Sequence, residues 1–294
     1  MRALIRKINS YSELCKVKIS LFSAISSAIG FMLASSEPKP QITILAIGAF
    51  CLACGSSALN QYQERAIDAL MERTKKRPLP SGEIEPFPAL VFSLMLLFLG
   101  SSTLLFTGSL AAPLLGLFAV FWYNGVYTPL KKRTAFAIIP GALVGAVPPA
   151  IGWVAGGGDL GDPRILALCF FFFIWQVPHF WLLILDYAEE YEQAGLPCLT
   201  VIFSKTQLMR ITFSWILATA VSCLFITVHR VIRFPLISLL LLAASFWLIG
   251  NGIILLRKRA SDSFYSFAFK RTNIYLFLVM ILLSADRVFM QVTQ

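Results

Sequence analysis

Charge is scarce in this sequence. Only 14% of its 294 residues are charged, whereas 57% are hydrophobic, and the mean hydropathy is +0.76. Soluble domains carry about a quarter charged residues. The composition therefore excludes an ordinary soluble domain and indicates a membrane protein.

Long polar segments are absent as well. The sequence has no soluble linker, no low-complexity tract and no second domain, only short loops between apolar segments. A cleaved secretory signal is also not expected, because the first apolar segment is too long, lacks a small-residue cleavage pattern and precedes eight others. We therefore expect a single transmembrane domain over residues 1–294.

Cysteine is sparse and mostly confined to apolar segments. Only six cysteines occur, and their positions argue against a disulfide framework. Cys51 and Cys54 form a CxxC pair, but small residues follow at 55–57 inside the second apolar segment. We interpret this pair as a site of close helix packing.

Nine apolar segments are long enough to cross a bilayer, which requires about 20 helical residues. They lie near residues 17–36, 42–63, 88–107, 109–128, 136–155, 165–185, 208–228, 234–256 and 272–290. The sequence thus predicts an all-α polytopic protein with nine transmembrane helices.

Lys and Arg concentrate in the N-terminal segment and in alternate connections, which together hold twenty of the twenty-five. Basic residues mark cytoplasmic loops, so we expect the N-terminus in the cytoplasm and the C-terminus outside. This distribution accounts for the net charge of +10. It predicts membrane lipid, and no nucleic acid, as a partner.

Two connections on the expected cytoplasmic side, residues 64–87 and 186–206, occupy equivalent places. Each follows the second helix of a four-helix set, which indicates two four-helix units in a parallel repeat with a ninth helix appended. Both connections begin with acidic residues. They are the strongest candidates for a functional site.

Acidic residues at a spacing of four open both connections. Asn60, Glu64 and Asp68 would share one helix face, because each step of four turns about 400°, and Asp186 and Glu190 repeat the spacing. Such carboxylates, with phosphate oxygens of a substrate, suit Mg²⁺. Ordinary solvated loop charges are the alternative, but two sets at equivalent positions favour a metal site.

The stretch "NQYQERAIDALMERTKKRPLPSG" at residues 60–82 resembles the first signature of the UbiA superfamily of intramembrane prenyltransferases, and Asp186 to Glu190 resembles the second. "YNGVYTPLKKRTAFAIIPGALVGAVPPAIGWVA" and "WQVPHFWLLILDYAEEYEQAGLPCL" resemble the branch that farnesylates heme. The similarity extends over essentially the whole chain. The chain departs from the family pattern at Glu64 and Glu190, where Asp is usual, at Ala66, where a third acid is usual, and at Tyr187, often a basic residue.

The resemblance implies a UbiA-type bundle and a farnesyl transfer. Farnesyl diphosphate would bind through Mg²⁺ to the acidic sets, and heme B would take the farnesyl group on a vinyl carbon, with water completing heme O. It also implies a bacterial inner membrane and a downstream heme A synthase or terminal oxidase. The residues expected to neutralise the diphosphate are Lys18, Arg65, Arg77, Lys132 and Lys205.

His179, in "VPHFW", and Trp175 are the expected heme-binding residues. A polar ring inside a span is costly without a partner, so His179 would either ligate heme iron or hydrogen-bond within the bundle. His229 is expected at the outer interface.

Two other functions stay open. A UbiA-type enzyme could prenylate an aromatic acid such as 4-hydroxybenzoate, and a heme-binding transporter would also have many helices and repeats. Transporter sites lie near the bilayer midplane, whereas these acids lie at the ends of spans, which favours an enzyme.

Overall fold

The described residues of the chain are helical apart from short connections. The computed structural model describes residues 2–35, 39–257 and 263–292. Lys258 and Arg259, which belong to a basic connection expected on the cytoplasmic side, lie outside them.

In chain order the helices are α1 (Arg2–Leu14), α2 (Val17–Ala34), α3 (Gln41–Asp68), α4 (Pro86–Leu105), α5 (Ala111–Val120), the π-helix η1 (Phe121–Tyr127), α6 (Thr128–Leu130), the 3₁₀-helix η2 (Ala135–Ala137), α7 (Ile138–Gly141), α8 (Leu143–Ala155), α9 (Pro163–Asp186), α10 (Ala188–Gln193), α11 (Leu199–Ile202), α12 (Lys205–Val228), α13 (Pro235–Arg257) and α14 (Ser263–Val292).

Helix starts follow local sequence signals. The Asp162 side chain accepts a hydrogen bond from the Arg164 backbone N–H and so caps α9, with Pro163 in the first turn. Ser204 and Gln207 form a capping box at the start of α12. These caps satisfy backbone donors that the helices cannot satisfy themselves.

Eight helical segments among the described residues are long and apolar enough to cross a membrane. The remaining expected span, residues 109–128, is helical from Ala111 to Leu130, but it consists of α5, η1 and α6 in succession. The all-helical, multi-pass membrane architecture is confirmed, and the count of nine stays a prediction.

Within each expected four-helix unit, helices that follow one another in the chain pack together. In the first unit α3 contacts α2 and α4, and α4 contacts α5; in the second, α9 contacts α8 and α12, and α12 contacts α13. The two units meet where α2 packs on α8. The last helix, α14, contacts α2, α9 and α13 and so joins both units.

The packing of α2 on α8 brings two backbones into contact. A Cβ atom at Gly152 would lie 1.7 Å from the Ser27 carbonyl oxygen, and one at Gly30 would lie 2.0 Å from that of Pro149. Any side chain at either position would force the helices apart. Small residues allow this approach in membrane bundles, where close van der Waals packing holds helices together.

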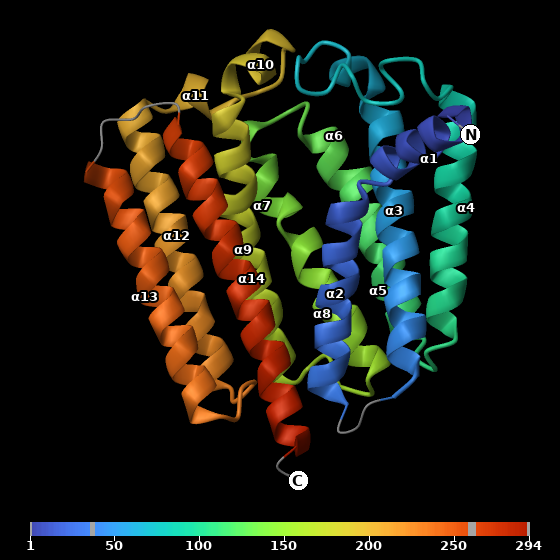
Figure 1. The fold of residues 1–294 in the computed structure, drawn as a ribbon. Coiled ribbons are helices and arrows are strands. Elements are labelled where there is room, and N and C mark those ends of the chain that lie inside the picture. Colours follow the sequence, from blue (N-terminus) through green and yellow to red (C-terminus); the bar gives the residue numbers. More distant parts are fainter. Residues whose placement is uncertain (1, 36–38, 258–262, 293–294) are drawn as a thin grey trace.

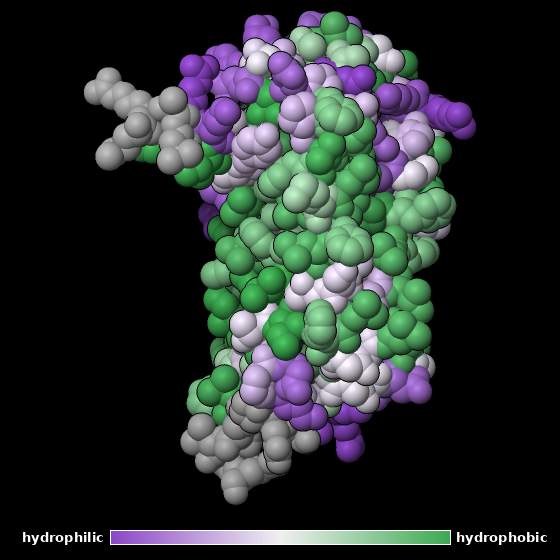
Figure 2. All heavy atoms as spheres, turned by 90° about the vertical axis from the view of Figure 1, so that its right-hand side faces the viewer, coloured by the Kyte–Doolittle hydropathy of each residue, from purple (hydrophilic) through white to green (hydrophobic). Residues whose placement is uncertain are grey.

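Large apolar side chains cover the outside of the bundle. Phe98 on α4 and Phe246 on α13 are 76% and 72% exposed. Figure 2 shows a hydrophobic belt between hydrophilic ends on the face that it presents. This surface suits hydrocarbon rather than water.

Polar connections gather at one end of the bundle, which we call the N-terminal end. Residues 69–85, α10 and α11 lie there, α1 lies across the ends of the neighbouring helices, and the C-terminus lies at the opposite end (Figure 1). Glu83 holds α1 by accepting hydrogen bonds from Ser10 Oγ at 2.6 Å and Arg6 Nη2 at 2.9 Å. Both acidic connections therefore open at the same end, as the repeat predicts.

Candidate active site

The first acidic set occupies the last turns of α3. This helix extends to Asp68, beyond the expected end of its span, so that Asn60, Glu64 and Asp68 lie on consecutive turns. Asn60 and Asp68 are buried, at 1% and 2% exposure. Burial of an amide and a carboxylate at the end of a membrane helix requires polar partners.

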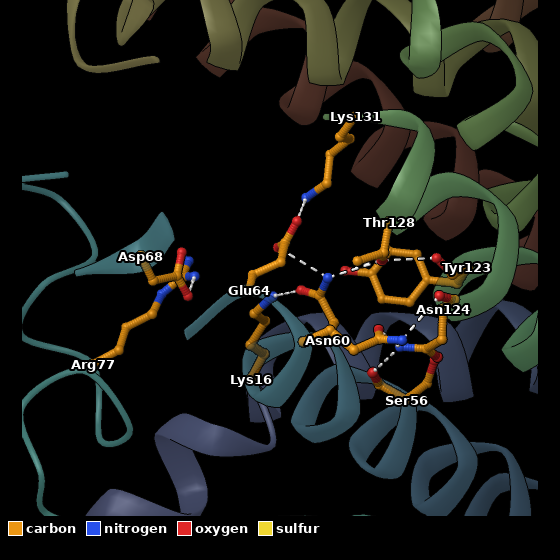
Figure 3. Close-up of polar contacts among 11 residues, drawn as sticks. Lys16, Ser56, Asn60, Glu64, Asp68, Arg77, Tyr123, Asn124, Thr128 and Lys131 are labelled. Atoms are coloured by element: carbon orange, nitrogen blue, oxygen red, sulfur yellow. Dashed lines mark hydrogen bonds and ion pairs between the residues drawn. The ribbon is translucent and has the colours of Figure 1, made fainter. Parts of the chain in front are cut away.

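Asn60 is the centre of a hydrogen-bond network (Figure 3). Its Oδ1 accepts a hydrogen bond from Lys16 Nζ at 3.1 Å. Its Nδ2 donates to Glu64 Oε2 at 2.9 Å and to Thr128 Oγ1 at 3.0 Å. The amide thus links the α1–α2 junction, α3 and α6.

The backbone around Lys16 explains why its side chain reaches Asn60. Gln61 Nε2 donates to the carbonyl oxygens of Glu13 and Leu14, each at 3.0 Å, and so fixes the end of α1 against α3. Lys16 then takes the left-handed conformation, with φ 46°, before α2 begins. Removal from water and the nearby Arg77 lower the pKa of Lys16 to about 7.

Glu64 and Lys131 form an ion pair. Their Oε1 and Nζ atoms are 2.5 Å apart, and both side chains are less than one-fifth exposed. Burial alone would lower the pKa of Lys131, but the Glu64 carboxylate opposes it and holds this pKa above its usual value.

Asp68 pairs with Arg77 on the connection that follows α3. Asp68 Oδ2 lies 2.7 Å from Arg77 Nη1, and Thr74 Oγ1 donates to the Asp68 carbonyl at 2.8 Å. The connection therefore folds back over the end of its own helix. Each carboxylate of the first set already has a cationic partner.

The second acidic set does not continue one helix. α9 ends at Asp186, which is exposed, Tyr187 takes a non-helical conformation with φ −121° and ψ 24°, and Glu190 lies on α10. Asp186 and Glu190 keep their spacing of four in sequence but lie on different helices, because the chain turns between them.

Arg73 joins the two acidic connections. Its backbone N–H donates to Glu190 Oε2 at 2.9 Å, and its guanidinium lies 4.9 Å from the centre of the Tyr187 ring. Among the described residues, the carboxylates do not converge into a cluster of three or more that could hold a metal by itself. The acids are separated across two connected segments: Glu64 and Asp68 pair with cations, and Glu190 accepts a backbone hydrogen bond.

The five cations expected to bind the diphosphate have different surroundings in the structure. Arg77 lies at the acidic set, whereas Lys18, Lys132 and Lys205 are exposed. Arg65 stacks on Tyr62, with its guanidinium 4.5 Å from the ring centre.

Lys16 and Lys131, rather than Lys18 and Lys132, contact the acidic set. Lys16 and Lys18 are two residues apart and Lys131 and Lys132 are adjacent. Neither spacing puts both side chains of a pair on one helix face, so only one lysine of each pair faces the site. The four-residue spacing of Tyr127 and Lys131 is the signal that could have indicated Lys131 as the lysine that faces the acidic set.

An aromatic stack runs from this network toward α9. The Tyr123 and Tyr127 rings lie 5.7 Å apart at 25°, and Phe180 lies 6.0 Å beyond Tyr127. Lys131 Nζ lies 5.2 Å from the centre of the Tyr127 ring. The wider turns of the π-helix η1 carry both tyrosines, and π-helical turns are frequent at functional sites.

His179 lies on α9 among aromatic rings. The imidazole centre is 4.6 Å from Trp175 and 5.0 Å from Phe269, and its Nδ1 is 2.7 Å from Asn273 Oδ1. Trp175 donates its own Nε1–H to the Thr272 carbonyl at 3.0 Å. His229 is exposed at the C-terminal end of the bundle, where an interfacial residue was expected.

The model of the UbiA prenyltransferase family matches residues 23–278 of this chain. The chain belongs to the UbiA prenyltransferase family. Membership of this family, with its long apolar helices, makes the chain an integral membrane prenyltransferase.

Several relatives of this chain are named protoheme IX farnesyltransferase. The chain is 38% identical to protoheme IX farnesyltransferase 1 of Pseudomonas fluorescens over 94% of its length and 92% of that protein. It is 44% identical to protoheme IX farnesyltransferase of Geobacter sulfurreducens over 64% of its length and 69% of that protein.

Solved structures of the UbiA family share the fold. A structure of digeranylgeranylglyceryl phosphate synthase matches with a TM-score of 0.77 at 18% identity, covering 96% of this chain and 99% of that one. A UbiA homolog from Archaeoglobus fulgidus bound to GPP and Mg²⁺ matches with a TM-score of 0.64 at 15% identity, covering 94% and 99%. The predicted UbiA-type bundle is thereby confirmed.

Proposed function

We propose that this prenyltransferase transfers the farnesyl group of farnesyl diphosphate to a vinyl group of heme B, with addition of water, and so produces heme O and diphosphate. The names of its relatives support this acceptor. The observation that carries the proposal is the presence, in one bundle, of carboxylate–cation pairs suited to a diphosphate and a histidine held among aromatic rings suited to a porphyrin.

The acidic sets fit Mg²⁺ by the chemistry of their donors. Carboxylate and amide oxygens are the ligands that Mg²⁺ prefers, and it usually takes few of them together with substrate phosphates. We propose that Mg²⁺ is held by Asn60, Glu64, Asp68, Asp186 and Glu190. When bound, it would neutralise charge on the diphosphate. The UbiA homolog from Archaeoglobus fulgidus, which is bound to GPP and Mg²⁺, supports this proposal.

The cations of the site would then exchange partners. Lys131 and Arg77, which pair with carboxylates in this structure, would donate to phosphate oxygens of the substrate, and Lys16 lies beside them. Fixed donors aimed at a leaving diphosphate stabilise the charge that develops as its bond breaks. Lys18, Arg65, Lys132 and Lys205 are exposed and would act at the rim of the site.

The reaction would proceed through substrate carbocations. The bond between C1 of farnesyl and the diphosphate oxygen breaks, and the terminal vinyl carbon of heme B supplies its electron pair to C1. The positive charge then lies on the inner vinyl carbon, where water adds and releases a proton. The faces of Tyr123 and Tyr127 lie beside Lys131 and would stabilise the allylic cation.

The distribution of charged and apolar residues indicates how the protein would lie in the membrane. The N-terminal end, which carries the acidic connections and most basic residues, would face the cytoplasm of a bacterium from its inner membrane. The charged diphosphate would arrive from that side and the farnesyl chain would lie among apolar helices. A heme A synthase or terminal oxidase would use the product.

Mass spectrometry of a transfer assay tests the proposal. Purified protein in detergent receives farnesyl diphosphate and Mg²⁺ with either heme B or 4-hydroxybenzoate, and a parallel reaction contains EDTA. We expect a heme adduct of one farnesyl group plus one water, which EDTA abolishes. An adduct on the aromatic acid would replace heme as the acceptor, and folded protein that modifies neither would contradict the proposal.

A further inference from the structure

The imidazole of His179 has a fixed plane. Trp175, one turn earlier on α9, is tilted by 31° to it, and Phe269 on α14 is tilted by 32°. Contact with rings on two different helices prevents the imidazole from rotating freely. Its two nitrogens therefore point in defined directions.

Asn273 defines which nitrogen carries the hydrogen. Its Oδ1 lies 2.7 Å from His179 Nδ1, and an amide oxygen can only accept, so Nδ1 is the donor. A neutral imidazole has one N–H, which leaves a lone pair on Nε2. No described residue forms a hydrogen bond with Nε2, and Nε2 is not among the buried polar atoms that lack a partner.

Only one of the two ring nitrogens of His179 has a hydrogen-bond partner among the described residues, and this indicates a role beyond packing. A ring that served only packing would have both nitrogens satisfied or replaced, because an unsatisfied polar atom within a membrane protein is costly. Here one nitrogen has a precise partner and the other is accessible. Histidines that ligate metals show the same division, with the second nitrogen donating to a carbonyl or carboxylate that orients the ring.

We propose that Asn273 is a positioning residue: it fixes the Nδ1–H tautomer of His179 and so directs the Nε2 lone pair toward the iron of the porphyrin substrate. This inference rests on the proposed function. The adjacent Thr272 supports it, because its carbonyl accepts from Trp175 Nε1 at 3.0 Å. One turn of α14 thereby holds both the histidine and the ring stacked on it.

The acceptor role of Asn273 can be isolated in a His179→Gly variant supplied with small ligands. Imidazole can bind iron through one nitrogen and donate its N–H to Asn273, whereas 1-methylimidazole can bind iron but cannot donate. 4-Methylimidazole has the same size as 1-methylimidazole and keeps its N–H. We expect imidazole and 4-methylimidazole to restore the absorption spectrum of heme-loaded protein at about tenfold lower concentration than 1-methylimidazole. Equal restoration by all three, or none by any, would overturn the proposal.

Substitutions of Asn273 give an independent measurement. Asn273→Leu removes the acceptor, and we expect about tenfold weaker heme binding and a lower iron–histidine stretching frequency in the ferrous complex. Asn273→Asp keeps an acceptor and should preserve binding and raise that frequency. The matched control is Asn251→Leu, because Asn251 lies on α13 and donates to the Trp247 carbonyl.

The outcomes separate this inference from the proposed function. If Asn273→Leu and the control Asn251→Leu have the same heme affinity and the same iron–histidine stretching frequency, the positioning role of Asn273 is overturned. This holds even if the wild type farnesylates heme. If Asn273→Leu does not fold, the ligand series decides, since it leaves Asn273 in place. Failure of the wild type to farnesylate heme B, with its heme spectrum intact, would overturn the function and not the ligation.

Discussion

Two adjacent lysines at the end of the fourth expected span have different surroundings. Lys131 lies 2.5 Å from Glu64 and contacts the Tyr127 ring, whereas Lys132 is exposed. An exposed cation is screened by water and salt, while an enclosed one acts in a medium of lower dielectric constant. The two residues form a natural matched pair.

We expect Lys131→Met to lower kcat/KM for prenyl transfer by about 10²-fold or more, the usual effect of removing a donor that stabilises a developing negative charge. Lys132→Met should change it by about twofold at most. Steady-state assays on both variants measure the difference. A comparable loss in both would mean that the lysines contribute only general positive charge.

Asp68 and Asp186 should both be essential although only Asp68 is buried. We expect Asp68→Asn and Asp186→Asn each to abolish turnover and leave the protein folded in detergent, because each loses a charged oxygen ligand of the kind Mg²⁺ prefers. Asp162→Asn, which alters a carboxylate paired with Arg164 before α9, is the control. Near-normal activity in both site variants would refute a metal site built from two acidic sets.

Sequence spacing predicted the placement of the acids of the first set but not which lysines contact them. Asn60, Glu64 and Asp68 were placed on one helix face by their spacing, and α3 does carry them on consecutive turns. The choice between Lys16 and Lys18 depends on the left-handed backbone at Lys16 and on Gln61. Contacts between α1 and α3 determine which of these two lysines faces the site, and residue spacing does not reveal such contacts.

At the scale of elements, the connection at residues 69–85 and α10 form one unit. The Arg73 N–H to Glu190 hydrogen bond and the Arg73–Tyr187 contact join them across 117 residues of sequence. These two contacts link the connection after α3 to the helix that carries Glu190.

We expect Glu190→Ala to increase hydrogen exchange of the backbone around Arg73 by about tenfold, because a hydrogen bond to a charged group contributes about 1.5–3 kcal/mol. Exchange measured by mass spectrometry without substrate or Mg²⁺ tests this. Glu189→Ala, which alters the exposed neighbouring carboxylate, should leave the exchange unchanged. If both variants exchange equally, the connections are held by other contacts.

Element boundaries were predictable where hydrophobic length decides them and not where the backbone deviates from an α-helix. The apolar run at residues 109–128 predicted one span, but the chain forms a π-helix at Phe121–Tyr127. Similarly, the four-residue spacing of Asp186 and Glu190 suggested a helix that Tyr187 interrupts. Both deviations occur beside the candidate site, where tertiary contacts outweigh local preference.

For the whole molecule, composition and the length of the apolar segments were sufficient to predict a helical membrane bundle, and the repeat predicted that both acidic connections share one end. The orientation in the membrane rests on the distribution of Lys and Arg. It is testable because five of the six native cysteines are buried and the sixth is partly buried.

We expect a membrane-impermeant thiol reagent to label Leu160→Cys, in the exposed connection before α9, in intact cells. Lys76→Cys, in the exposed connection after α3, should react only after the membrane is opened. The unsubstituted protein controls for the native thiols. The reverse pattern would invert the orientation and place the acidic sets outside.

The position of α14 in the chain also sets an order of assembly. His179 and Asn273 are 94 residues apart, and ribosomes add about 5–20 residues per second. Asn273 is therefore synthesised about 5–20 s after His179. During that interval Phe269 is also missing. With the proposed ligation, a nascent chain would lack an oriented porphyrin ligand until α14 has inserted, and heme capture would then follow closure of the bundle.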